Sequence, residues 1–333
     1  MNDRPLLIVL TPVRNEAWIL HAFLKATSLW ADYIIIADQM STDGSRDIYS
    51  QYEKVILVDN PRTEMHQART RQLLFEAAKK IEGDKILFAL DADEFLSGDF
   101  VNTPSWQLIL NSKPGDVFCF RWMNLLPNLT QYQKHKYIPF YWIGNLSDND
   151  LNLGYFPDNH IHEPRLPWPV KLNIEYILDD IHLIHFARVN ERRQKNKEIF
   201  YQVSTVYKED KYSGIKLFRH YQTYKPIIAK DIESVPDDMY LYYLKHGVDI
   251  IKEIKFNDEG LYYVTEVDKM LKSKDLRLFA KLDIWSDDFL KQHNIKNPQS
   301  LVDKLVTIYL RATKKYHDSY LVKCVDWLLK RIY

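Results

Sequence analysis

The clearest sign of both fold and chemistry is the stretch Ile86-Leu87-Phe88-Ala89-Leu90-Asp91-Ala92-Asp93-Glu94-Phe95. Its five leading apolar residues are too few for a helix and are typical of a strand buried on both faces of a parallel sheet. Side chains alternate along an extended chain, so Asp91 and Asp93 face the same way where the strand ends. Two neighbouring carboxylates repel each other unless a cation lies between them, and hard oxygen ligands favour Mg²⁺ or Mn²⁺. The alternative interpretation is a solvated loop, because Asp is common where strands turn.

Similar apolar runs occur upstream, at residues 6–10, 33–37 and 55–58. Between them, residues 16–28 and 66–80 carry apolar side chains at helical spacing. This alternation predicts an α/β fold, a doubly wound domain with a mostly parallel sheet of buried strands. Sheets of this kind bind ligands beyond the carboxyl ends of their strands, so the residues just after each run are the candidates for function.

The pattern changes after residue 116. Residues 117–168 are dense in aromatic residues and proline, which predicts long functional loops over the sheet. From residue 191 the sequence becomes helical and rich in lysine and tyrosine. We therefore predict two domains, a catalytic one over residues 1–215 and an α-helical C-terminal region over residues 216–333.

The last fourteen residues, 320–333, form an amphipathic segment. Leu321, Val325, Leu328 and Leu329 share one side of it, and charged residues occupy the other. We expect a terminal helix that docks its apolar side on the protein. The alternative is peripheral contact with a membrane.

The charge balance argues against nucleic acid as a partner, because 45 basic and 45 acidic residues leave no basic excess. Residues 1–189 hold 18 basic and 24 acidic residues, and residues 190–333 hold 27 and 21, so the acidic half is the better place for a cation. The two cysteines, Cys119 and Cys324, form no disulfide framework or cysteine-rich zinc site and suit a reducing compartment. We also expect no signal peptide and no membrane span. We therefore predict that the protein is cytoplasmic, with the inner face of the membrane as a second location.

Three motifs in this order resemble those of glycosyltransferase family 2, which has the GT-A fold, a Rossmann-like fold for nucleotide-diphospho-sugar transferases. They are residues 11–16 (TPVRNE), residues 30–38 (WADYIIIAD) with Ser41-Thr42-Asp43, and residues 91–94 (DADE). The sequence is most similar to bacterial members of the lipopolysaccharide-core type. The resemblance implies metal-dependent, inverting transfer of a sugar from a nucleoside diphosphate donor to a glycan or lipid-linked hydroxyl acceptor. It also implies a role in cell-surface polysaccharide synthesis.

The resemblance also assigns roles to individual residues. Donor binding falls to the following residues: Pro12, Arg14, Glu16, Asp38, Arg71 and Asp91. Asp91 and Asp93 would bind the divalent metal with His185, although a histidine in an apolar strand is more often a core residue. Residues 159–164 resemble a short His-Glu element near the acceptor, which makes Glu163 the candidate general base and Asp158 the second candidate. The alternative for Glu163 is an ion pair with Arg165.

Two other functions fit parts of the sequence. Phosphatases of the haloacid dehalogenase type also place Asp-x-Asp after a strand, with the first Asp as nucleophile. Their motif usually lies near the start of the chain and has Thr or Val where Phe95 stands here. A non-catalytic sugar- or nucleotide-binding scaffold is the other alternative, because Gln39 and Met40 replace smaller residues of the family. The sequence lacks the glycine-rich fingerprints of P-loop and nicotinamide enzymes.

Overall fold

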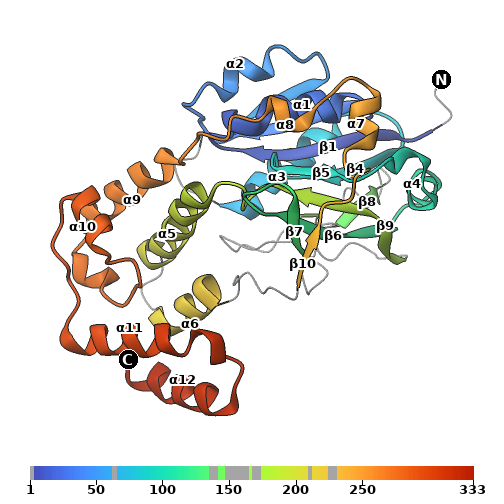
Figure 1. Ribbon diagram of the computed structural model, residues 1–333. Coiled ribbons are helices and arrows are strands. Elements are labelled where there is room, and N and C mark those ends of the chain that lie inside the picture. The colour runs from blue at the N-terminus through green and yellow to red at the C-terminus, as the bar shows by residue number, and fades with distance from the viewer. Residues whose placement is uncertain are drawn as a thin grey trace. The chain divides into compact units, whose positions relative to one another are not determined.

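The computed structural model describes residues 4–61, 66–134, 142–146, 165–166, 174–208, 212–223 and 231–333. Within these residues, ten strands form one mixed sheet (Figure 1). Its parallel part has the order β3-β2-β1-β4 and consists of β1 (Leu6–Val13), β2 (Tyr33–Asp38), β3 (Val55–Asp59) and β4 (Lys85–Ala89). These are the four strands that the apolar runs predict. The α/β fold class is thereby confirmed, with the Rossmann-like strand order of this class.

Successive residues of these strands alternate between two hydrophobic clusters. Leu7 and Val9 of β1 belong to the cluster that includes α1 (Ala17–Ser28), whereas Ile8 and Leu10 belong to the cluster that includes α3 (Gln67–Lys79). The same alternation occurs in β2 and β4. Burial on both faces explains why these strands are apolar throughout. The prediction is wrong only for β3, which lies at the edge of the sheet and leaves Leu57 partly exposed, because an edge strand is covered less completely.

The remaining strands extend the sheet beyond β4. They are β5 (Glu94–Leu96), β6 (Val117–Leu125), β7 (Gln131–Lys134), β8 (Trp142–Leu146), β9 (Glu175–His185) and β10 (Ile232–Ser234). Most of their pairs are antiparallel, and the pairing of β6 with β9 is parallel. The prediction of long loops over residues 117–168 is therefore wrong where β6, β7 and β8 lie. The many aromatic residues favour loops in the sequence, but several of them belong to strands and pack in the core, as Phe118 and Phe120 do.

The chain forms two compact units, residues 1–189 with 230–257 and residues 190–229 with 258–333. The first unit also contains α2 (Ser45–Tyr49), α4 (Pro104–Leu110), α7 (Leu241–Lys245) and α8 (Ile250–Glu253). The segment 231–257 joins this unit because β10 pairs with β7 and Lys25 of α1 bonds Glu253 of α8 at 2.7 Å. This division by contacts differs from the predicted domains 1–215 and 216–333, which remain a prediction.

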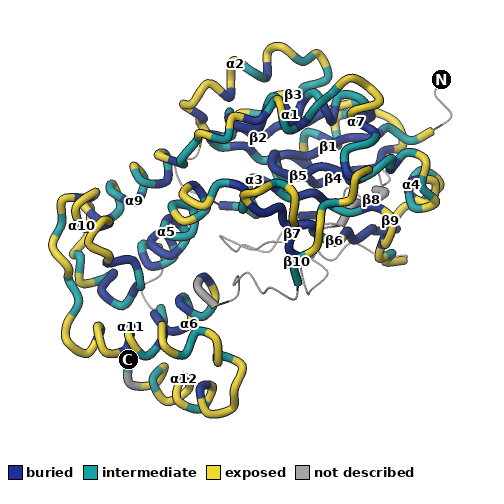
Figure 2. The backbone as a smooth tube through the Cα atoms, in the orientation of Figure 1, coloured by how far each residue is buried: buried dark blue, intermediate teal, exposed yellow. Residues whose placement is uncertain are grey.

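The second unit is helical, as predicted for the C-terminal region. It consists of α5 (Glu191–Lys208), α6 (Gly214–Phe218), α9 (Leu261–Ser273), α10 (Asp287–His293), α11 (Leu301–Ala312) and α12 (Tyr320–Ile332). The terminal helix α12 docks, but not by the predicted side. Its buried residues include Val322 and Asp326, while Leu321 and Leu328 are exposed. Figure 2 shows that much of α12 is exposed. Asp326 is buried because it pairs with Arg219. Within the described residues, every helix is too short or too polar to cross a lipid bilayer.

Candidate active site

The candidate site lies where β1 and β4 end. The order β3-β2-β1-β4 reverses direction at β1, and such a reversal leaves a crevice beyond the carboxyl ends of the strands. Leu10 of β1 lies beside Ala89 of β4 in register, so residues 11–16 and 91–94 leave neighbouring strands at the same edge. The structure therefore brings these two sequence motifs together.

Two arginines hold the carboxylate of Asp91. Arg71 of α3 donates to Oδ1 and Arg165 donates to Oδ2, each at 2.8 Å. Burial alone would raise the pKa of Asp91, but the positive charges of Arg165 and Arg71 outweigh it and hold the pKa below its ordinary value. Asp91 is therefore a fixed anion whose oxygens both face guanidinium groups. This arrangement orients the Asp-x-Asp turn.

Glu94 stabilises the same turn from inside the protein. Its side chain is fully buried and accepts hydrogen bonds from Arg165, from Trp122 Nε1 at 2.9 Å and from the Asp91 backbone amide at 3.0 Å. Arg165 is itself buried and also donates to the Ala89 carbonyl oxygen at 3.0 Å. Because the carboxylate is fully buried and its oxygens accept from Arg165, Trp122 and the Asp91 amide, we assign Glu94 a positioning role.

Asp93 faces His185. Asp93 Oδ2 lies 3.6 Å from His185 Nε2, and both side chains are largely buried. His185 Nδ1 lies 2.8 Å from the amide oxygen of Asn124, a contact that suits a ring whose Nδ1 donates. In the neutral form of that ring, the Nε2 lone pair faces the Asp93 carboxylate, and a cation between the two groups would stabilise this arrangement. Trp122 stacks on the imidazole ring, with centroids 4.6 Å apart, and fixes its orientation.

Strand pairing places His185 beside the motif. β9 pairs with both β5 and β6, so His185 lies opposite Glu94 on one side and Asn124 on the other. The Phe186 amide donates to the Asp93 carbonyl oxygen at 2.9 Å. These backbone contacts bring residues far apart in the sequence to one end of the sheet.

The loop after β1 is tied to the loop after β2. The Asn15 amide donates to Ser41 Oγ at 2.9 Å, and the Thr42 amide donates to Asn15 Oδ1 at 2.7 Å. Asn15 and Met40 adopt left-handed backbone conformations, with φ of 56° and 53°. Non-glycine residues hold such conformations only where their surroundings fix them, and they often do so at functional sites.

The predicted donor-binding residues lie around these two loops. Pro12 and Arg14 are half-buried at the end of β1, and Glu16 accepts from Trp18 Nε1 at 2.6 Å. Asp38 is completely buried, and Arg46 and Tyr49 donate to its oxygens. These contacts account for the burial of the Asp38 carboxylate. Its contact with a nucleoside remains a prediction.

The described residues fit a metal that shares its ligands with a substrate. They contain no group of three or more Asp, Glu, His or Cys residues that could hold an ion by themselves. Mg²⁺ and Mn²⁺ commonly take only one or two protein side chains and complete their coordination with phosphate oxygens and water. Asp93 and His185 match that requirement, while Asp91 is held by its arginines.

The predicted base cannot be placed. Glu163 and Asp158 lie outside the described residues, so the structure neither supports nor opposes their roles. Arg165, which the sequence pairs with Glu163, instead pairs with Asp91 and Glu94 in the described part of the chain.

The family model for glycosyl transferase family 2 matches residues 8–160. This part of the chain is similar to that family. The match spans both loops and the Asp-x-Asp turn. It confirms the resemblance, the fold class and the enzyme class, a glycosyltransferase dependent on a nucleotide sugar.

Solved structures similar to this chain have low sequence identity. Staphylococcus aureus TarS residues 1–349 are 10% identical with a TM-score of 0.37, and the match covers 86% of this chain and 89% of TarS. GalNAc-T7 with UDP, GalNAc and Mn²⁺ is 12% identical with a TM-score of 0.41, over 82% of this chain and 58% of that one. Mycobacterium tuberculosis glucosyl-3-phosphoglycerate synthase with Mn²⁺, UDP and phosphoglyceric acid is 16% identical with a TM-score of 0.26, over 37% and 44%. No curated protein matches the sequence.

Sequence reasoning missed Arg165, Glu94 and Asn124 as parts of this site. Glu94 carried a signal, because it directly follows the Asp-x-Asp pair at the end of a buried strand. Arg165 and Asn124 carried none, because their positions depend on long-range pairing.

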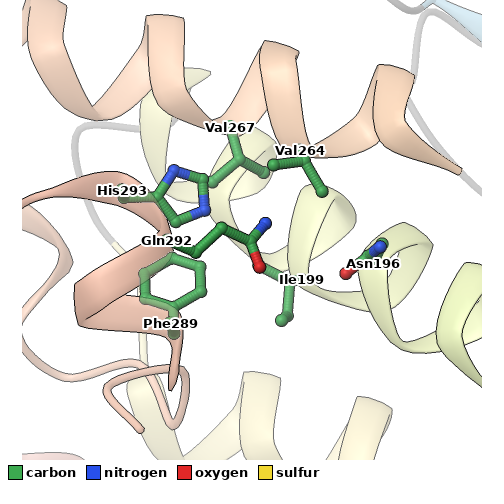
Figure 3. A pocket seen from close by; sticks show the side chains of 7 residues that line it. All are labelled: Asn196, Ile199, Val264, Val267, Phe289, Gln292 and His293. Atoms are coloured by element: carbon green, nitrogen blue, oxygen red, sulfur yellow. The ribbon is translucent and has the colours of Figure 1, made fainter. Parts of the chain in front are cut away.

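A small cavity in the helical unit is not part of this site. It lies between α5, α9 and α10, and Figure 3 shows His293 and Phe289 beside it. Burial lowers the pKa of His293, although Asp268 nearby opposes that shift. The cavity measures about 10 Å³, which is room for one water molecule at most.

Proposed function

We propose that this protein transfers a glycosyl group from a nucleoside diphosphate sugar to a hydroxyl acceptor, with Mg²⁺ or Mn²⁺ and with inversion at the anomeric carbon. The observation that carries the metal requirement is the pair formed by Asp93 Oδ2 and His185 Nε2, 3.6 Å apart and largely buried at the end of β4. The family match supports the class of reaction.

Asp93 and His185 would hold the ion. When bound, the ion offsets the negative charge that develops on the departing diphosphate. Arg71 lies close by, and its buried Nη1 has no hydrogen-bond partner within the described residues. A buried donor without a partner is costly, so we propose that Nη1 donates to a diphosphate oxygen. Asp91 would then orient Arg71 towards the donor.

The acceptor side of the reaction rests on Glu163, with Asp158 as the second candidate. We propose that this carboxylate takes the proton of the acceptor hydroxyl. At the same time the acceptor oxygen bonds to the anomeric carbon, and the bond between that carbon and the diphosphate breaks. Pro12, Arg14, Glu16 and Asp38 remain the proposed contacts to the nucleoside. A glycan or lipid-linked acceptor, a role in cell-surface polysaccharide synthesis and a cytoplasmic location complete the proposal.

Two measurements test this function. We expect calorimetry to show that uridine or guanosine diphosphate binds tightly only when Mn²⁺ is present. A screen of sugar nucleotides should then identify a donor that the protein hydrolyses slowly without an acceptor. Release of phosphate from small esters without metal-dependent nucleotide binding would instead indicate the phosphatase. Nucleotide binding with neither hydrolysis nor transfer for any sugar nucleotide would indicate the scaffold.

A further inference from the structure

The last two helices of the chain expose several large apolar side chains. We define the C-terminal apolar face as Leu301, Leu305 and Ile308 of α11 with Leu321, Trp327 and Leu328 of α12. These six side chains are 52–80% exposed. Isolated exposed apolar residues are ordinary in proteins, whereas several on two linked helices are typical of a surface that meets another molecule.

The face is opposite the side by which each helix packs. In α11 the buried residues Val306 and Leu310 contact Ile215 and Phe218 of α6, while the exposed positions recur at helical spacing on the other side. In α12 the ion pair between Asp326 and Arg219 fixes the inward side. The exposed residues are therefore not a misplaced core, because each helix already buries a different stripe.

The two helices are held together as one surface. Tyr309 of α11 donates to Asp326 Oδ1 of α12 at 3.0 Å, and Figure 1 shows the helices side by side. Figure 2 shows exposed residues along both of them. The face is thus a pair of linked helices with apolar residues on the outside.

The surroundings of the face are basic. Residues 301–333 contain seven lysines and arginines and three aspartates. Two of the aspartates, Asp303 and Asp326, are buried and bonded within the protein. Exposed cations include Lys304, Lys323 and Lys330. The whole second unit has 23 basic and 15 acidic residues, a formal net charge of +8.

We propose that the C-terminal apolar face binds the surface of a membrane that contains anionic lipids. Helices with exposed leucine and tryptophan on one side and lysine at the border lie in the lipid interface, where the apolar side enters the acyl region and the cations meet anionic headgroups. Trp327 has the amphipathic ring that prefers this depth. A second copy of the chain is disfavoured, because a symmetric contact through this face would bring two units of charge +8 together.

Vesicle flotation tests this proposal with the full chain. We expect the protein to float with vesicles of phosphatidylcholine and phosphatidylglycerol, to bind vesicles of phosphatidylcholine alone at least about tenfold more weakly, and to dissociate as salt is raised. The double variant Leu305→Ser, Leu328→Ser should bind at least about tenfold more weakly than the wild type. Leu244→Ser with Leu261→Ser is the matched control, because these leucines are also 51% and 62% exposed but lie outside the face.

Melting temperature and light scattering complete the test. Exposed leucines contribute little to stability, so both double variants should melt close to the wild type. If the first variant fails to fold, Leu301→Ser with Leu321→Ser removes two other residues of the same face. The proposal is overturned if no vesicle binds, if neutral and anionic vesicles bind equally, or if the control weakens binding as much. It is also overturned if the wild type is a dimer that the face variant converts to a monomer.

Discussion

Asp93→Asn is expected to lower donor hydrolysis and sugar transfer by at least about a hundredfold. The substitution keeps the size of the side chain but removes the charge that, with His185, would hold the ion. Charge stabilisation of a leaving group by a metal is worth several kcal/mol, and about 1.4 kcal/mol corresponds to a tenfold change in rate. Turnover of the donor at saturating Mn²⁺ measures the effect, and calorimetry should show that Mn²⁺ no longer strengthens nucleotide binding.

The matched control for this variant is Asp179→Asn. Asp179 also lies on a strand of the sheet, but its side chain is exposed and pairs with Arg121. We expect its activity to stay near that of the wild type. Asp93→Asn should also melt close to the wild type, because asparagine keeps the size of the buried side chain and one of its acceptor oxygens. Wild-type turnover by the Asp93 variant would contradict the assignment.

Arg165→Met is expected to lower the free energy of unfolding by about 3–5 kcal/mol, because it leaves the fully buried Glu94 without its charge partner. Methionine replaces much of the volume of the side chain, so the loss is mainly electrostatic. Thermal or urea unfolding monitored by circular dichroism measures it. The pKa of Asp91 lies below its ordinary value in the folded protein. The ionised Asp91 therefore contributes to the free energy of unfolding at neutral pH, and this contribution disappears as the pH falls through the acid range.

A double-mutant cycle with Glu94→Gln separates this cause from a packing defect. If an unpaired buried carboxylate causes the loss, then Arg165→Met with Glu94→Gln should be more stable than the sum of the single effects predicts. Additive effects would show that Arg165 acts through packing alone. A change below about 1 kcal/mol for Arg165→Met would contradict the described ion pairs.

The parallel half of the sheet could be predicted from sequence because its physics is local. A strand buried on both faces must be apolar at consecutive positions, as residues 86–90 are, and its exit must be polar. The helices between the strands follow from their spacing. Asp91 and Asp93 could therefore be placed at one end of the sheet without any knowledge of the rest.

The other half could not be predicted because it depends on contacts between distant residues. Arg165 reaches Asp91 across 74 positions, and Asn124 meets His185 only because β6 pairs with β9. The resemblance to family 2 pointed to His185, and the structure places it beside Asp93, but its role as a ligand remains a prediction. The prediction that α12 docks by its apolar side is wrong because the polar Asp326 is buried in an ion pair with Arg219.

The most direct measurement is anomalous diffraction from crystals grown with uridine or guanosine diphosphate and Mn²⁺. We predict a manganese peak at the Asp93 carboxylate and His185 Nε2, with the nucleotide diphosphate completing the coordination of the ion. A nucleotide bound without manganese, or a manganese peak away from both side chains, would contradict it.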